Sequence, residues 1–240
     1  MNFALIFAGG IGSRMKQTGK PKQFLELCGE PILIRTLKRF LMSADVDNVV
    51  VVCLLAYIDV LNDMIANLRP NKKVYVVPGG KTGQESIFNG LRKIKELAKN
   101  KDDLVIIHDG VRPFIKTDQI SEGIQIAKKF GNCVAASPAI ETIAIKGASN
   151  NVETIFNRAK CLTLKAPQIF RFEEILLAHV QAISDKKFDF VDSAQMMMFY
   201  GHKIHTMECD STNIKITTVV DYFTAEGIVK NEEMQNVFGL

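Results

Sequence analysis

A glycine-rich segment near the start of the chain has the composition of a phosphate-binding loop. Three glycines lie within residues 8–12, and Ser13 and Arg14 follow them. Glycine lets backbone N–H groups approach an anion, and successive N–H groups can surround phosphate oxygens. The segment has Met15 where a dinucleotide fingerprint has its third glycine, and it lacks the Gly-Lys-Ser/Thr of a Walker A loop. A tight turn is the simpler alternative, but Arg14 and Lys22 on the same connection favour a nucleotide-binding loop.

A second group of polar residues follows a later apolar run. Asp109 lies just beyond residues 104–107, and Arg112 comes three positions later. A carboxylate at the end of a strand can hold Mg²⁺ or a substrate hydroxyl. An aspartate before Gly110 is also a common turn former, which is the alternative. We interpret His108 as structural.

The segments that must position these residues alternate between apolar β-type runs and helical patterns. Strands are expected at residues 3–8, 49–54, 74–77, 104–107 and 133–137. Nearly unbroken apolar strands separated by helices are typical of a parallel sheet that is covered on both faces. We therefore expect an α/β fold, a Rossmann-like and mostly parallel sheet, as a single domain over residues 1–240. Ligands of such sheets bind beyond the carboxyl ends of the strands.

The alternation breaks at residues 139–165. Short β-type runs at 142–145 and 152–155 flank the turn-rich residues 147–151, and this pattern predicts a protruding β-hairpin arm. A lone hairpin is only marginally stable, so we expect the arm to pack against another surface, and a second subunit is the expected partner. The rest of the chain is expected to form a helix from Phe172, a helix from Asp192, strands at 203–207 and 213–216, and a helix after Thr218.

Composition limits the classes to which the chain can belong. Hydrophobic residues make up 47% and charged residues 23%, as in soluble globular proteins, and no apolar run approaches the ~20 residues of a membrane span. The net charge is only +4, with no Lys/Arg block interleaved with aromatics, so we expect no nucleic-acid partner and no membrane partner. The five cysteines form no C-x-x-C pair, and the first residues have the pattern of an apolar strand and not that of a secretory leader, so we expect a cytoplasmic protein that is not secreted.

Several motifs together resemble one enzyme family. The glycine-rich segment with residues 21–24 resembles the nucleotidyltransferase signature of the cytidylyltransferases that act on ribitol 5-phosphate and on 2-C-methyl-D-erythritol 4-phosphate. Further motifs match in the family's order: Gly79-Gly80 with Ser86, residues 108–113, Glu141-Thr142, Asn157-Arg158, Ala166-Pro167-Gln168 with Phe170, and residues 213–217. They span nearly the whole chain. The resemblance implies a nucleotidyltransferase-type fold and transfer of CMP from CTP to a polyol phosphate, with release of pyrophosphate.

The resemblance places the nucleotide side of the reaction mainly at the start of the chain. The acceptor's phosphate oxygen attacks the α-phosphorus of CTP, so cations must oppose the charge that develops on the phosphates. By resemblance, Arg14 and Lys22 stabilise the transition state and the leaving pyrophosphate. The positions that bind CTP by resemblance are Phe7, Ala8, Gly9, Gly10, Gly12, Ser13, Gly79, Gly80, Lys81 and Ser86.

The acceptor side draws on residues from later in the chain. By resemblance, Lys215 and Arg158 position the incoming phosphate, although alternation in residues 214–216 could equally turn Lys215 to solvent. Asp109, Arg112 and Thr142 match acceptor-binding positions, and Asp109 is also the expected ligand of Mg²⁺ or another divalent cation. Because Thr142 and Arg158 fall in the arm, we expect a homodimer in which each arm completes the other subunit's site.

Some positions depart from the family's usual pattern. Gly83 stands where relatives usually carry Arg, and Thr212 where the methylerythritol enzymes usually carry Asp, with Asp210 as a substitute metal ligand. Gly9 replaces their typical Ala, and together with residues 111–114 it favours ribitol 5-phosphate as the acceptor. The alternative acceptor is 2-C-methyl-D-erythritol 4-phosphate. Two other functions remain open: a nucleotide-binding regulatory module without turnover, and a sugar-phosphate nucleotidyltransferase that uses UTP or GTP.

Overall fold

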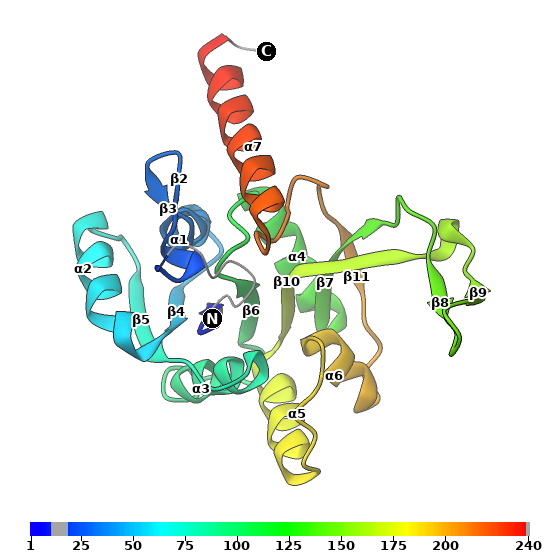
Figure 1. The fold of residues 1–240 in the computed structure, drawn as a ribbon. Coiled ribbons are helices and arrows are strands. Elements are labelled where there is room, and N and C mark those ends of the chain that lie inside the picture. Colours follow the sequence, from blue (N-terminus) through cyan, green and yellow to red (C-terminus); the bar gives the residue numbers. More distant parts are fainter. Residues whose placement is uncertain (11–18, 239–240) are drawn as a thin grey trace.

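The computed structural model describes residues 1–10 and 19–238, and a seven-stranded sheet forms the centre of the molecule (Figure 1). The strand order is β11-β7-β10-β6-β1-β4-β5. The bounds are β1 Asn2–Ala8, β4 Asn48–Cys53, β5 Lys73–Pro78, β6 Leu104–Asp109, β7 Asn132–Pro138, β10 Leu162–Arg171 and β11 Thr206–Glu208. Strand β10 runs antiparallel to β6 and β7, and the other pairings in this sheet are parallel. The expected α/β fold with a mostly parallel sheet is confirmed.

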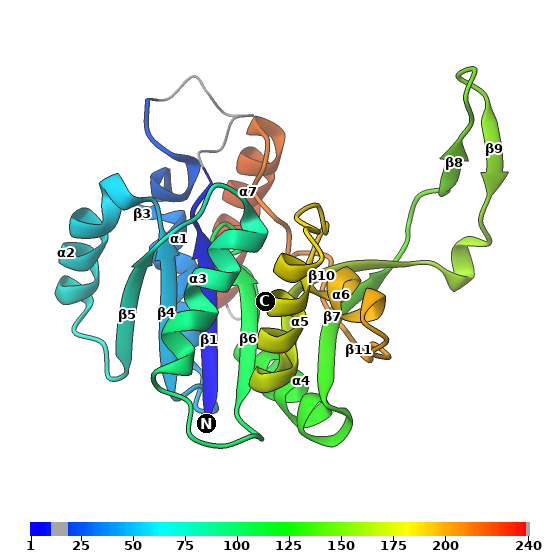
Figure 2. The ribbon, with the colours of Figure 1, turned by 90° about the horizontal axis from the view of Figure 1, so that it is seen from below.

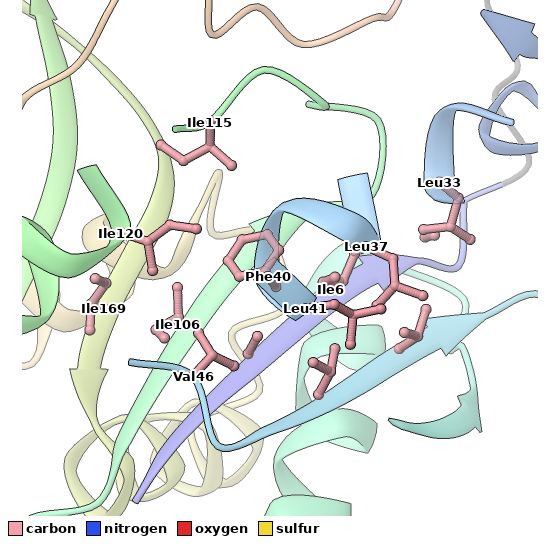
Figure 3. Close-up of a cluster of buried hydrophobic side chains, with 14 of the residues drawn as sticks. Ile6, Leu33, Leu37, Phe40, Leu41, Val46, Ile106, Ile115, Ile120 and Ile169 are labelled. Atoms are coloured by element: carbon pink, nitrogen blue, oxygen red, sulfur yellow. The ribbon is translucent and has the colours of Figure 1, made fainter. Parts of the chain in front are cut away.

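Helices cover both faces of the sheet because its central strands are apolar on both sides. The three helices packed on one face are α1 Ile32–Met42, α2 Ile58–Leu68 and α4 Thr117–Phe130. The three on the other are α3 Gly83–Lys95, α5 Phe172–Ser184 and α6 Ser193–Phe199. In Figure 3, Leu37 and Phe40 of α1 lie among the residues that pack with Ile106 of β6. Two buried cores therefore hold the strand ends in fixed positions.

The last helix, α7 Val219–Phe238, packs against a third core. This core joins Ala225 and Val229 of α7 to Leu27 of β2 (Glu26–Leu27), which pairs with β3 (Glu30–Pro31). It also contains Val111 and Ile216, the second of which lies in the segment that leads into α7. The loop after β6 and the approach to α7 are thereby packed together. No helix in the described part of the chain is long and apolar enough to cross a membrane.

The hairpin arm is present and stands apart from the sheet. Strands β8 (Ala144–Lys146) and β9 (Val152–Ile155) pair antiparallel as a separate two-stranded sheet, and Figures 1 and 2 show them projecting from the body. Every residue of both strands is exposed. A short 3₁₀ turn, Arg158–Lys160, leads back into β10.

Two elements differ from the sequence expectation. Residues 213–216 were expected to form a strand, but they lie outside the strands and helices of the described structure. Their backbone makes turn bonds, from Asn213 N to Asp210 O and from Ile214 N to Thr212 O; in addition, Ile216 N donates to Val111 O and Asn213 O accepts from Arg112 Nη1. Strand β10 was not expected, because Pro167 cannot donate to a sheet ladder and interrupts its β-type pattern.

Candidate active site

Two pockets adjoin at the carboxyl ends of β1 and β6. The glycine-lined pocket, of about 370 Å³, has Gly9, Gly10, Lys22, Gly80 and Ser86 in its wall. The deep pocket, of about 390 Å³, is lined by residues of β6, β10, α3 and the loop before α6. Residues that border both pockets are Phe7, Thr82, Gly83, Asp109 and Lys215. Two ligands, one in each pocket, would therefore come closest to each other beside Asp109 and Lys215.

The glycine-lined pocket depends on a close approach of two backbones. A Cβ atom on Gly9 would lie 2.7 Å from Ser86 Oγ and 3.1 Å from Gly79 Cα, closer than ordinary contacts allow. Ser86 Oγ accepts from Gly80 N at 3.0 Å and donates to Thr82 O at 2.8 Å, so it has little freedom to move. In this chain, glycine at both approach points lets the two backbones come this close, and it leaves backbone groups at the pocket wall.

The first turn of α3 borders both pockets. The Thr82 side chain caps this helix by accepting from Glu85 N at 3.1 Å. Unpaired N–H groups at a helix N-terminus favour an anion. Gly83, in the place of the family's usual Arg, leaves open space there, since an added Cβ would meet no atom within 4 Å. This edge of the pockets suits a phosphate or another anionic group.

Asp109 is the carboxylate at the boundary between the pockets, and two cations hold it. Lys215 Nζ lies 2.5 Å from Asp109 Oδ1, and Arg112 Nε lies 3.4 Å from Oδ2. Burial acts to raise the pKa of this carboxyl, but Lys215 and Arg112 outweigh burial and hold the pKa below its usual value. Asp109 is therefore ionised at neutral pH. Lys215 borders both pockets, although its side chain is about two-fifths exposed.

Arg112 is buried and fixed by backbone as well as by Asp109. Its Nη1 donates to Asn213 O at 2.6 Å, and its own carbonyl lies 2.9 Å from His108 Nε2. Burial lowers the pKa of His108 to about 4, so its ring is neutral. His108 is fully buried, and its contact with the carbonyl of Arg112 helps to fix the backbone of the loop after β6.

The donor set fits a divalent cation only in part. No group of three or more His, Cys, Asp or Glu side chains in the described residues could hold a metal ion. The Asp210 carboxylate is occupied by Lys116 Nζ at 2.7 Å, so nothing here supports it as a substitute ligand. Asp109 alone could supply one oxygen. Mg²⁺ is commonly bound by one or two carboxylates together with substrate phosphates and water, and this arrangement is compatible with that mode.

Comparison with known proteins decides the family. The model of the family described as IspD, 2-C-methyl-D-erythritol 4-phosphate cytidylyltransferase, matches residues 3–231. The chain belongs to this cytidylyltransferase family. Its members and structural neighbours are nucleotidyltransferases that use CTP, and this chain is such an enzyme.

Three similar proteins illustrate the relatives of this cytidylyltransferase and the acceptors for which they are named. A ribitol-5-phosphate cytidylyltransferase of Vibrio parahaemolyticus is 41% identical, with all of both chains covered. A 2-C-methyl-D-erythritol 4-phosphate cytidylyltransferase of Clostridium acetobutylicum is 33% identical over 98% of this chain and all of its own. The solved structure of 4-diphosphocytidyl-2C-methyl-D-erythritol synthase from Anaerococcus prevotii has a TM-score of 0.83 at 25% identity, and 96% of each chain is covered.

Not every expected site residue of the cytidylyltransferase lies at these pockets. Gly12, Ser13 and Arg14 fall outside the described residues. Thr142 and Arg158 lie exposed on the arm, where Arg158 Nη1 donates to Ile140 O at 2.9 Å, and neither is among the described residues that line the two pockets. The other expected residues at the pockets are Phe7, Ala8, Gly9, Gly10, Lys22, Gly80, Lys81, Ser86, Asp109, Arg112 and Lys215. Gly79 packs behind them against Gly9.

Sequence reasoning missed several residues of the deep pocket. Lys165 and Gln168 of β10 line it, as does Asp192 before α6. Gln168 Nε2 donates to Asp192 Oδ2 at 2.9 Å, and Gln168 Oε1 accepts from Ala194 N at 3.0 Å, which fixes the start of α6. The motif Ala166-Pro167-Gln168 was recognised as a match, but no role was drawn from it. Its position beside Asp109 becomes evident only once β10 is paired with β6.

Proposed function

We propose that this enzyme transfers CMP from CTP to D-ribitol 5-phosphate and forms CDP-ribitol and pyrophosphate. The observation that carries the proposal is the meeting of the two pockets at Asp109 and Lys215. One pocket suits a nucleotide and the other a polyol phosphate. Their shared boundary is where an acceptor oxygen would approach the α-phosphorus.

CTP is assigned to the glycine-lined pocket. Backbone groups at Gly9, Gly10 and Gly80 offer close polar contacts, and Lys22 lies in the same wall. Cations that oppose charge developing on the transferred and leaving phosphates account for most catalysis in such reactions. Lys22, together with Arg14, is proposed to stabilise the transition state and the leaving pyrophosphate.

The acceptor is assigned to the deep pocket with its phosphate at the boundary. A phosphate monoester is largely ionised at neutral pH, so its oxygen needs no covalent intermediate or strong base in order to attack. Lys215 is placed to hold that phosphate next to the nucleotide, and Arg112 keeps Asp109 and Lys215 in position through its own contact with Asp109. Holding the two anions at reacting distance is the main task of these residues.

A divalent cation, Mg²⁺ by preference, is proposed as the cofactor. Asp109 faces both pockets and could be its protein ligand, with phosphate oxygens and water completing the shell. When bound, such an ion neutralises phosphate charge. We also propose a cytoplasmic location, which the free state of all five cysteines supports.

Ribitol 5-phosphate is preferred as the acceptor for two reasons. The 41% identical relative carries that name, and Gly9 departs from the Ala that is typical of the methylerythritol enzymes. The second candidate is 2-C-methyl-D-erythritol 4-phosphate, which is favoured by the description of the matching family. One added or missing group in a pocket changes specificity by only about 1–3 kcal/mol, so the two acceptors must be compared directly.

The arm is proposed to make a homodimer. Its exposed apolar side chains would be costly in a monomer, and they are Ile140, Ile145, Val152, Ile155 and Phe156. Thr142 and Arg158 are also on the arm and are not among the residues that line the two pockets of their own chain. A two-fold dimer in which each arm reaches the partner's site would bury the apolar residues and bring Thr142 and Arg158 to a substrate.

Pyrophosphate release is the experiment that tests the proposed function. Purified enzyme with Mg²⁺ is given CTP, UTP, GTP or ATP in combination with each of the two polyol phosphates. We expect release with CTP and ribitol 5-phosphate at the highest kcat/KM. Equal kcat/KM for UTP and CTP would contradict the nucleotide assignment. No release with any polyol phosphate, while CTP still binds, would instead favour a regulatory module.

A further inference from the structure

Lys165 of β10 lines the deep pocket, which is the pocket assigned to the acceptor, and it lies in an irregular part of its strand. The ladder of β10 with β7 shifts register between Leu164 and Gln168, so the backbone leaves its regular pairing there. Gln168 pairs with Ile107 in the antiparallel ladder with β6. Lys165 falls within the irregular stretch, three residues before Gln168. The Lys165 side chain lines the deep pocket and not the glycine-lined pocket.

The ammonium of Lys165 is held by a neutral partner. Lys165 Nζ donates to the backbone carbonyl of Asp210 at 3.2 Å. The Asp210 carboxylate is paired with Lys116 instead, at 2.7 Å. Among the residues that the structure describes, no carboxylate forms an ion pair with Lys165. An ammonium has three N–H donors, so Lys165 can accept an anionic partner without breaking an ion pair.

The other cations of the deep pocket are already engaged. Arg112 contacts Asp109 and the carbonyl of Asn213, and Lys215 contacts Asp109. Partial burial is the main reason that the pKa of the Lys165 ammonium is lowered; Arg112 lowers it further, and nearby Cys209 and Asp210 act in the opposite direction. A bound dianion would attract the ammonium and so offset both the cost of burial and the repulsion from Arg112.

We infer that Lys165 binds the phosphate of the acceptor and sets the affinity of the deep pocket for phosphorylated polyols. This inference deepens the proposed function and rests on its assignment of the deep pocket to the acceptor. Lys215 would hold the phosphate from the nucleotide side and Lys165 from the acceptor side. A neutral polyol would gain little from Lys165.

The test measures acceptor affinity in Lys165→Met, which keeps the length of the side chain and removes its charge. Calorimetry gives the Kd of D-ribitol 5-phosphate, of 2-C-methyl-D-erythritol 4-phosphate and of inorganic phosphate, and kinetics give KM and kcat. Loss of a charged hydrogen bond should raise the Kd and KM of the polyol phosphate about 10- to 100-fold. The KM of CTP should stay within about twofold, and inhibition by neutral ribitol should not change. Lys165→Arg should recover most of the affinity.

Lys116→Met is the matched control, because it removes a lysine that also contacts Asp210 but does not line either pocket. A merely structural role of Lys165 in holding Asp210 predicts similar losses in both variants. The inference predicts a loss in Lys165→Met alone. The pH profile is a second readout. Acceptor affinity of the wild type should fall on the alkaline side as Lys165 loses its proton, and this limb should move to higher pH in Lys165→Arg.

Failures of the two proposals are distinguishable. If wild-type enzyme binds a polyol phosphate without turning it over, the proposed reaction is wrong, and the Kd values still decide the role of Lys165. Unchanged Kd and KM in Lys165→Met, or an equal loss in Lys116→Met, would overturn the inference. If neither polyol phosphate binds the wild type, both proposals are wrong.

Discussion

Lys215 Nζ lies 2.5 Å from Asp109 Oδ1, and this contact joins the segment before α7 to the carboxyl end of β6. Lys215 is about two-fifths exposed and Asp109 is almost fully buried. The ion pair therefore anchors an exposed lysine to a carboxylate that is fixed by its burial. The packing of Ile216 against Val111 reinforces the same connection. The Lys215 side chain is thereby held at the boundary between the two pockets, where the reacting phosphates are proposed to meet.

Replacement of Lys22 should impair chemistry more than folding. Lys22→Ala is expected to lower kcat about 100- to 1000-fold, because a fixed cation that opposes charge on the phosphates is lost. Lys20→Ala is the matched control, since Lys20 is two residues away, exposed, and not among the described residues that line the glycine-lined pocket. Steady-state kinetics and circular dichroism check both. A Lys22→Ala enzyme that keeps near wild-type kcat would show that the assigned role is wrong.

Gly9→Ala should weaken CTP binding. The new Cβ would lie 2.7 Å from Ser86 Oγ and 3.1 Å from Gly79 Cα, and Ser86 is restrained by its bonds to Gly80 and Thr82. Relieving the overlap should cost about 1–3 kcal/mol and displace the wall of the glycine-lined pocket. We expect a higher KM for CTP and an unchanged KM for the acceptor. Gly227→Ala is the control, because a Cβ there meets no atom within 4 Å and Gly227 lies in α7, outside the residues that line the two pockets.

Two buried histidines should make the stability of the enzyme depend on pH. Burial lowers the pKa of His108 and of His179 to about 4. An unfolded histidine takes up a proton below about pH 6.5. Between these pH values the unfolded state binds more protons than the folded state. The stabilising contribution of the neutral, buried histidines is therefore complete above about pH 6.5, and the free energy of unfolding decreases as the pH falls towards 4.

His179→Phe tests this dependence and keeps a ring stacked against Phe88. Each histidine should contribute a slope of up to about 1.4 kcal/mol per pH unit within this window. Urea titrations from pH 4.5 to pH 7 should therefore give a shallower slope for the variant. An identical slope would mean that His179 does not titrate as its burial implies.

The central sheet could be predicted from sequence, and parts of the site could not. Strands β1, β4 and β6 are buried on both faces, so their apolar runs are unmistakable, and the hairpin turn at residues 147–151 predicted the arm. The rule that ligands bind at the carboxyl ends of the strands then pointed to Asp109, which is the last residue of β6. Lys165 gave no local signal, because its place in the deep pocket depends on the long-range pairing of β10 with β6. Residues 213–216 have the alternation of a strand but no partner ladder, and alternation alone cannot reveal a missing neighbour.

Mixing two inactive variants should restore activity if the arm works in the partner subunit. An Arg158→Ala chain and a Lys22→Ala chain, each nearly inactive alone, would form heterodimers in which one of the two sites has both residues intact. With random exchange, roughly a quarter of wild-type activity should return. Subunit exchange is verified with tagged chains. Absence of recovery despite exchange, or full activity of a monomer, would mean that each arm serves its own chain.

A direct competition between the two acceptors tests the central claim most closely. Wild-type enzyme receives CTP, Mg²⁺ and equal concentrations of D-ribitol 5-phosphate and 2-C-methyl-D-erythritol 4-phosphate, and mass spectrometry follows the two products over the first few per cent of conversion. The initial product ratio equals the ratio of kcat/KM for the two acceptors. The proposed function predicts that CDP-ribitol exceeds the methylerythritol product by at least about tenfold, the effect of roughly 1.4 kcal/mol. A product that is mainly 4-diphosphocytidyl-2-C-methyl-D-erythritol would contradict it.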